Sequence, residues 1–180
     1  MARRNHYAYY EALGRCHLGW VAGAEGNLDE GIAMLTDGLA ALRETRTALS
    51  VPGIYLLLSQ LYVHAGRLGD AMQMLEMATA DKGFALWDAD IERVRGDILA
   101  ADGASAEAAY WSSLTIARRQ QAGLLTCKAG LSLSRVLQSR GQQKEACALL
   151  EECLAPLHEG NDVGSVRQAR SMAKELAGMT

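Results

Sequence analysis

The sequence contains little that would interrupt a helix and little that would build a sheet. Only two prolines occur in 180 residues, Pro52 and Pro156, and both stand near expected helix ends, where proline is tolerated. Aromatic residues make up 6% of the chain, and no run alternates β-branched and polar residues as a half-buried strand would. These absences exclude a β-sheet protein and predict an all-α fold.

Long apolar runs and paired cysteines are also missing. The longest near-apolar stretch, residues 51–58, is far short of the roughly 20 residues that a membrane-spanning helix needs. Residues 1–10 lack the apolar segment of a signal peptide. The four cysteines form no CxxC pair: Cys16, Cys127, Cys147 and Cys153. We therefore expect reduced thiols, a cytoplasmic location and no membrane contact.

The charge pattern gives no sign of a polyanionic partner. The formal net charge is -3, and the basic residues form no long stripe interleaved with aromatics. Nucleic-acid binding is therefore not expected. Apolar residues at 49% and charged residues at 22% fit a folded chain. At this length we expect a single domain over residues 1–180.

What the chain does contain is a repeat. Four marker glycines, 40, 37 and 38 residues apart, are each followed four residues later by an acidic and then a small residue: Gly26, Gly66, Gly103 and Gly141. Seven residues before each marker stands a small residue, as a close crossing of two helices requires: Gly19, Ser59, Gly96 and Ser134. A helix–turn–helix unit with small residues at the crossing is the pattern of the tetratricopeptide repeat.

The repeat predicts a right-handed α-solenoid of four helix pairs and a final helix. The pairs cover residues 5–45, 51–82, 86–120 and 122–157. Their first helices are expected at 5–24, 51–65, 86–102 and 122–140, and their second helices at 28–45, 68–82, 105–120 and 142–157. A capping helix at 163–177, with Arg167, Arg170 and Lys174 on its polar face, is expected to cover the last pair.

Several runs resemble one bacterial family more narrowly. ADIERVRGDIL at 89–99 is similar to its "AELxRLKGELLL" run, and IARRQQA at 116–122 matches another. SLSRVL at 132–137, GQQKEACALL at 141–150 and EGND at 159–162 resemble further parts. The family is the carboxy-terminal tetratricopeptide tail of signalling proteins with a class III adenylate/guanylate cyclase domain and a P-loop ATPase domain. Related tails occur in ATPase-type transcriptional regulators.

Catalytic motifs are absent from the sequence. It has no GxxxxGK[ST], HExxH, GxSxG or GxGxxG, and its four histidines are scattered among different expected helices. We therefore predict that the chain is not an enzyme and uses neither a metal nor another cofactor. The resemblance then implies the tail without its catalytic domains.

A concave groove is the expected binding site, because first helices of stacked pairs line such a face. The repeat register places these residues on it: Cys16, Trp20, Leu56, Gln60, His64, Arg93, Asp97, Lys128, Leu131, Arg135 and Gln138. The first half of this set is apolar to neutral, and the second half carries three cations. Those cations could hold an acidic side chain or a terminal carboxylate of a partner. Internal pairing, such as Arg93 with Asp97 at i,i+4, is the alternative.

The leading prediction is a non-enzymatic protein–protein interaction or regulatory module that binds a peptide or domain in this groove. Two alternatives stay open: a small-metabolite sensor that controls an attached ATPase, and a homo-oligomerisation module. Self-association could bury the aromatic start of the chain at Tyr7, Tyr9 and Tyr10. Trp87 and Trp111 are expected to pack between the second and third repeats.

Overall fold

The computed structural model describes residues 2–46, 49–81, 83, 85–158 and 163–179. It is 84% helical, and the described residues contain nine α-helices, one short 3-10 helix and no strand. The predicted all-α class is therefore confirmed. The segment at 159–162 that resembles the family's EGND-like run lies outside the described residues.

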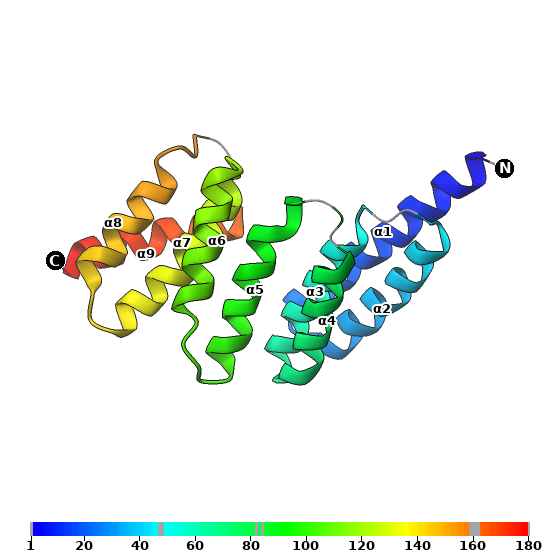
Figure 1. The fold of residues 1–180 in the computed structure, drawn as a ribbon, viewed down its shortest axis with the longest axis horizontal. Coiled ribbons are helices and arrows are strands. Elements are labelled where there is room, and N and C mark those ends of the chain that lie inside the picture. The colour runs from blue at the N-terminus through cyan, green and yellow to red at the C-terminus, as the bar shows by residue number, and fades with distance from the viewer. Residues whose placement is uncertain (1, 47–48, 82, 84, 159–162, 180) are drawn as a thin grey trace. The chain divides into compact units, whose positions relative to one another are not determined.

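The chain divides into two compact units, residues 1–104 and 105–180. The boundary falls in the turn after α5, inside the third predicted repeat. Unit 1 contains six helical elements: α1 (Ala2–Ala24), α2 (Leu28–Glu44), α3 (Val51–His64), α4 (Leu68–Asp81), η1 (Ala85–Trp87) and α5 (Asp88–Ala101). Helices α1 and α2 pack side by side, as do α3 and α4, and α3 also contacts both α1 and α5 (Figure 1).

Unit 2 contains α6 (Glu107–Arg119), α7 (Gly123–Ser139), α8 (Gln143–Leu154) and α9 (Gly164–Met179). Helix α9 packs on α7 and α8. It buries one apolar face and leaves the three predicted basic residues, Arg167, Arg170 and Lys174, exposed. The amphipathic pattern of this last helix is thus as predicted.

The four marker glycines form the same turn. Their φ angles are +104°, +70°, +76° and +78°, which is the left-handed region that favours glycine. After each of them, the next backbone N–H donates to the carbonyl five residues earlier: Asn27 to Ala22, Arg67 to Tyr62, Ala104 to Leu99 and Gln142 to Leu137. This pattern ends a helix and satisfies its last carbonyls.

Close helix crossings also recur at the predicted small residues. In the first pair, a Cβ on Gly31 would lie 2.6 Å from the carbonyl oxygen of Gly19. In two later pairs the crossing residue is a serine whose buried hydroxyl donates to a carbonyl twelve residues later: Ser59 to Ala71 over 2.8 Å and Ser134 to Ala146 over 3.2 Å. Small side chains therefore let the helices approach closely in both units.

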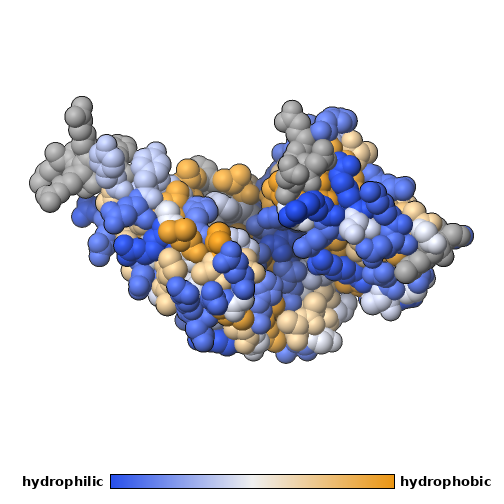
Figure 2. Space-filling model, turned by 180° about the vertical axis from the view of Figure 1, so that it is seen from behind, coloured by the Kyte–Doolittle hydropathy of each residue, from blue (hydrophilic) through white to orange (hydrophobic). Residues whose placement is uncertain are grey.

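On the face drawn in Figure 2, the surface is mostly hydrophilic and hydrophobic residues gather in small groups. Trp111 is 42% exposed, whereas Trp87 is half-buried. No helix among the described residues is both long and apolar enough to cross a membrane.

Candidate functional site

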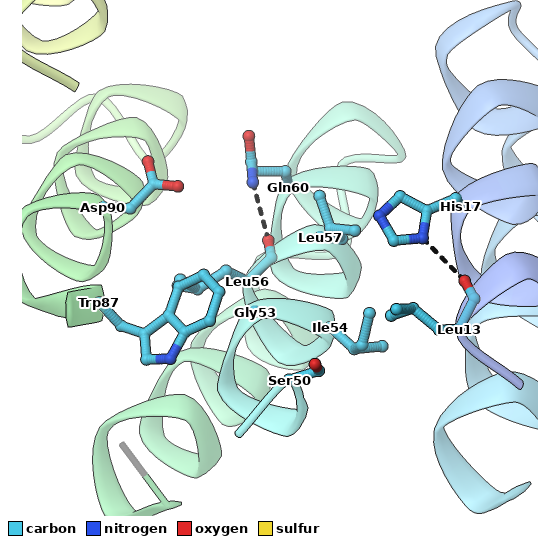
Figure 3. A pocket seen from close by; sticks show the side chains of 10 residues that line it. All are labelled: Leu13, His17, Ser50, Gly53, Ile54, Leu56, Leu57, Gln60, Trp87 and Asp90. Carbon is cyan, nitrogen blue, oxygen red and sulfur yellow. Dashed lines mark hydrogen bonds between the residues drawn. The ribbon is translucent and has the colours of Figure 1, made fainter. Parts of the chain in front are cut away.

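Unit 1 has a cleft of about 370 Å³ that spans α1, α3 and the η1–α5 segment. Helix α3 forms its floor, α1 forms one wall, and Trp87 and Asp90 form the other (Figure 3). The cleft is open on one side rather than enclosed. It is lined by Leu13, His17, Ser50, Gly53, Ile54, Leu56, Leu57, Gln60, Trp87 and Asp90.

The floor is apolar because α3 is packed between other helices on several sides. Its sequence, VPGIYLLLSQLYVH, contains no Asp, Glu, Lys or Arg. A Cβ on Gly53 would lie 2.6 Å from Cη2 of Trp87, so the indole rests directly on the backbone of α3. Because Gly53 has no side chain, Trp87 can pack against the second repeat, as predicted for this tryptophan.

Polar groups face the cleft from both walls. Nδ1 of His17 donates to the carbonyl oxygen of Leu13 over 2.8 Å. The other ring nitrogen, Nε2, points toward the side where Leu57 and Gln60 lie (Figure 3). The hydroxyls of Ser50 and Tyr9 are 2.6 Å apart and join α1 to the start of α3. The contact between Ser50 and Tyr9 holds the α1 wall in position over the floor.

Arg93 lies behind the α5 wall and is only 8% exposed. Its Nε donates to Asp90 over 2.7 Å, its Nη1 to Asp97 over 2.5 Å and its Nη2 to Gln60 over 3.0 Å. The amide nitrogen of Gln60 in turn donates to the carbonyl of Leu56 over 3.0 Å. The structure therefore shows the internal pairing of Arg93 with Asp97.

The other residues predicted for the groove in unit 1 occupy three different environments. Trp20 is half-buried and packs against the hydrophobic core, and His64 is exposed at the end of α3. Cys16 is fully buried, with its thiol where a Cβ on Gly38 would stand. Of the predicted groove residues, Leu56 and Gln60 line the cleft itself.

The remaining predicted residues lie on α7 in unit 2. Leu131 is buried, whereas Lys128 and Gln138 are half-buried. Arg135 is exposed, and its Nη2 donates to Oε1 of Gln168 on α9 over 3.1 Å. One of the three cations expected to face a partner thus contacts α9.

Sequence reasoning missed Leu13, His17, Ser50, Gly53 and Asp90 as cleft residues. A signal for three of them was present, because positions 13, 53 and 90 are spaced by 40 and 37 residues, like the marker glycines. The prediction used the equivalent set one helical turn later. Of that later set, Leu56 lines the cleft, whereas Cys16 and Arg93 are buried.

Chemically reactive groups are scarce in the described part of the chain. Burial raises the pKa of Cys16 and of Cys127 to about 11, so both thiols are protonated at neutral pH. Among the described residues, no three His, Cys, Asp or Glu side chains are grouped to hold a metal ion. What the cleft offers a ligand is therefore an apolar floor and hydrogen-bonding groups.

No protein-family model matches this sequence, and no curated protein matches it.

Proposed function

We propose that the chain is a non-enzymatic protein-interaction module built of tetratricopeptide-like helix pairs in a right-handed solenoid, and that it binds a partner peptide in the unit 1 cleft. The observation that carries this proposal is the position of the cleft across α1, α3 and α5. These are the first helices of successive pairs, which line the binding face of such solenoids. The repeated glycine turns and the repeated serine crossings support the same class.

The lining of the cleft indicates the chemistry of the bound segment. Its floor of Ile54, Leu56 and Leu57 suits an apolar side chain. The α5 wall suits a basic neighbour, since the carboxylate of Asp90 lines the cleft there and the face of Trp87 attracts cations. We expect a segment with an apolar anchor beside a lysine or arginine, in place of the acidic anchor that the cationic residues predicted.

The family resemblance provides a biological setting for this proposal. A tail of a cyclase/ATPase signalling protein would hold a neighbouring domain or a partner protein and so regulate the catalytic parts. The four cysteines are free thiols in the structure, which suits the reducing cytoplasm.

Selection from a displayed random-peptide library would test the binding site. The wild-type chain is expected to enrich peptides with the apolar–basic pattern. His17→Trp, at an exposed position on the α1 wall, should fill the cleft and lose most of this binding. Lys144→Trp is the matched control, because it adds the same ring at an exposed site on α8. Peptides that bind His17→Trp as well as the wild type would refute the cleft as the site.

A small-metabolite sensor is the second candidate. The cleft volume of about 370 Å³ lies in the range of small-molecule sites, and a few polar groups converge on an apolar floor. A thermal-shift screen of metabolite classes would separate the two functions. A metabolite that stabilises the wild type but not His17→Trp would favour the sensor, whereas enriched peptides and no metabolite hit would favour the interaction module.

A further inference from the structure

Helix α1 carries an exposed apolar stripe on the side away from the core. Its large side chains are Tyr7, Tyr10, Leu18 and Val21, which are 78%, 66%, 62% and 49% exposed. With Gly14, they fall within about 80° on a helical wheel of 3.6 residues per turn. The residues that α1 buries, including Ala12 and Cys16, lie on its other side. We call these five residues the α1 stripe.

The spacing of the α1 stripe is symmetric about Gly14. Tyr10 and Leu18 stand four residues before and after it, and Tyr7 and Val21 stand seven residues before and after it. If a second copy packs antiparallel across a twofold axis at Gly14, every large apolar side chain faces another. Tyr10 then faces Leu18 of the second copy, and Tyr7 faces Val21. Such self-complementarity is what a twofold interface requires.

No contact within the described chain explains why residue 14 is a glycine. A Cβ at this position would meet no atom within 4 Å, whereas a Cβ on Gly19, Gly31 or Gly38 would clash with a packed neighbour. Glycine in a helix interior lowers helix stability relative to alanine. A glycine at the axis would, however, let two helices approach closely.

The helix dipoles favour the antiparallel orientation over the parallel one, because the two dipoles then run in opposite directions.

We propose that the α1 stripe is a homodimer interface in which two α1 helices pack antiparallel, with Gly14 of each copy at the twofold axis. The proposal does not depend on the cleft, whose residues on α1 are Leu13 and His17. A dimer would present two clefts, so a partner with two binding segments would be held more tightly than by one chain.

Sedimentation equilibrium over a range of protein concentrations tests the interface. The wild type should show a concentration-dependent monomer–dimer equilibrium. Leu18→Glu should raise the dimer dissociation constant by at least about tenfold, because it places a charge against Tyr10 of the second copy. Leu124→Glu is the matched control at an exposed leucine of α7, and it should leave the constant unchanged. Circular dichroism would verify that both variants stay folded.

Gly14→Ala provides a second variant with opposite effects on two measurements. It should raise the melting temperature at dilutions where the chain is monomeric, since nothing surrounds the new methyl group. It should also weaken the dimer, because the methyl groups separate the two helices at the axis. A stronger dimer would contradict the close approach at this glycine.

Cross-linking decides the orientation. A short bismaleimide should link a Tyr7→Cys chain to a Val21→Cys chain in a mixture, and neither variant to itself. The four native thiols are buried and should contribute little background. A strictly monomeric wild type, a Leu18→Glu dimer as tight as the wild type, or self-linking of Val21→Cys would each overturn the proposal.

Discussion

The guanidinium of Arg93 on α5 donates from Nη2 to Oε1 of Gln60 on α3 over 3.0 Å, which joins these two helices. Arg93 also pairs with Asp90 and Asp97 on its own helix. A residue with the charge expected of a partner-binding anchor is thus used to hold α5 against α3. Because this contact positions Asp90 and Gln60, it also shapes one side of the cleft.

Removing Arg93 should destabilise unit 1. Arg93→Ala leaves Asp90 and Asp97 without their buried cation, and we expect a loss of about 2–3 kcal/mol in the free energy of unfolding. The two aspartate side chains are 16% and 25% exposed, so water offsets part of the loss. Urea unfolding followed by circular dichroism would measure it.

Arg95→Ala is the control for this prediction. Arg95 is 39% exposed and lies 3.4 Å from Glu92, so its removal should change stability by less than about 0.5 kcal/mol. Equal losses for the two variants would show that the buried Arg93 contacts contribute no more to stability than the exposed Arg95–Glu92 pair.

The α1–α2 crossing should not tolerate a methyl group. Gly31→Ala places a Cβ 2.6 Å from the carbonyl oxygen of Gly19 and 2.8 Å from atoms of Gly23, all of which are backbone atoms that cannot rotate away. We expect a loss of about 1–3 kcal/mol from overpacking, measured by the same urea titration.

Gly69→Ala is the same substitution at a site where it should raise stability rather than lower it. Gly69 lies in α4, and a Cβ there would meet nothing within 4 Å. The change should stabilise the chain by up to about 1 kcal/mol. Destabilisation by Gly69→Ala as large as that by Gly31→Ala would contradict the close crossing.

The turn between α6 and α7 contains a non-glycine residue in the left-handed region. Gln121 has φ +54°, and the following residue, Ala122, donates its N–H to the carbonyl of Ala117 as in the four glycine turns. Gln121→Gly should therefore raise the free energy of unfolding by about 1 kcal/mol. Gln142→Gly, where φ is -90°, should give no such gain.

Stability should fall in alkaline solution because of the buried thiols. Burial raises the pKa of Cys16 and Cys127 from 9.0 to about 11, so the folded state binds more protons than the unfolded state between these two values. The free energy of unfolding then decreases as the pH rises through this interval. The raised pKa of Tyr55, which also follows from burial, acts in the same direction.

Urea midpoints measured from about pH 8 to about pH 11 would follow this decrease. The Cys16→Ala/Cys127→Ala chain is the control: it should be less stable at neutral pH but show a shallower decline. An equally steep decline in both chains would attribute the effect to other groups.

Much of the fold was predictable because it depends on local patterns. The glycine turns, the small residues at the crossings and the apolar face of α9 are encoded within segments of one or two helices. The largest errors in helix bounds are three residues, at the start of α1 and the end of α8. Trp111 is 42% exposed, and its expected packing between the second and third repeats stays a prediction.

The candidate site was only partly predictable, as Gln60 and Arg93 illustrate. Both stand on the first helices that the repeat assigned to the groove, yet Gln60 lines the cleft and Arg93 lies behind it. Helix periodicity places a side chain on a face, but the rotation of one helix against the next determines whether that face is open. Gly53 shows the same limit, because its role depends on Trp87, 34 residues later.

The sequence by itself determined the helices, their turns and the close crossings of α1 with α2, α3 with α4 and α7 with α8, since hydrogen bonding and steric fit between near neighbours decide these. It also contains the symmetric spacing of the α1 stripe. Only the tertiary structure decided which polar groups face the cleft, that Arg93 pairs with aspartates of its own helix, and that the apolar stripe of α1 stays exposed. Those outcomes depend on contacts between residues far apart in the chain, and no local pattern records them.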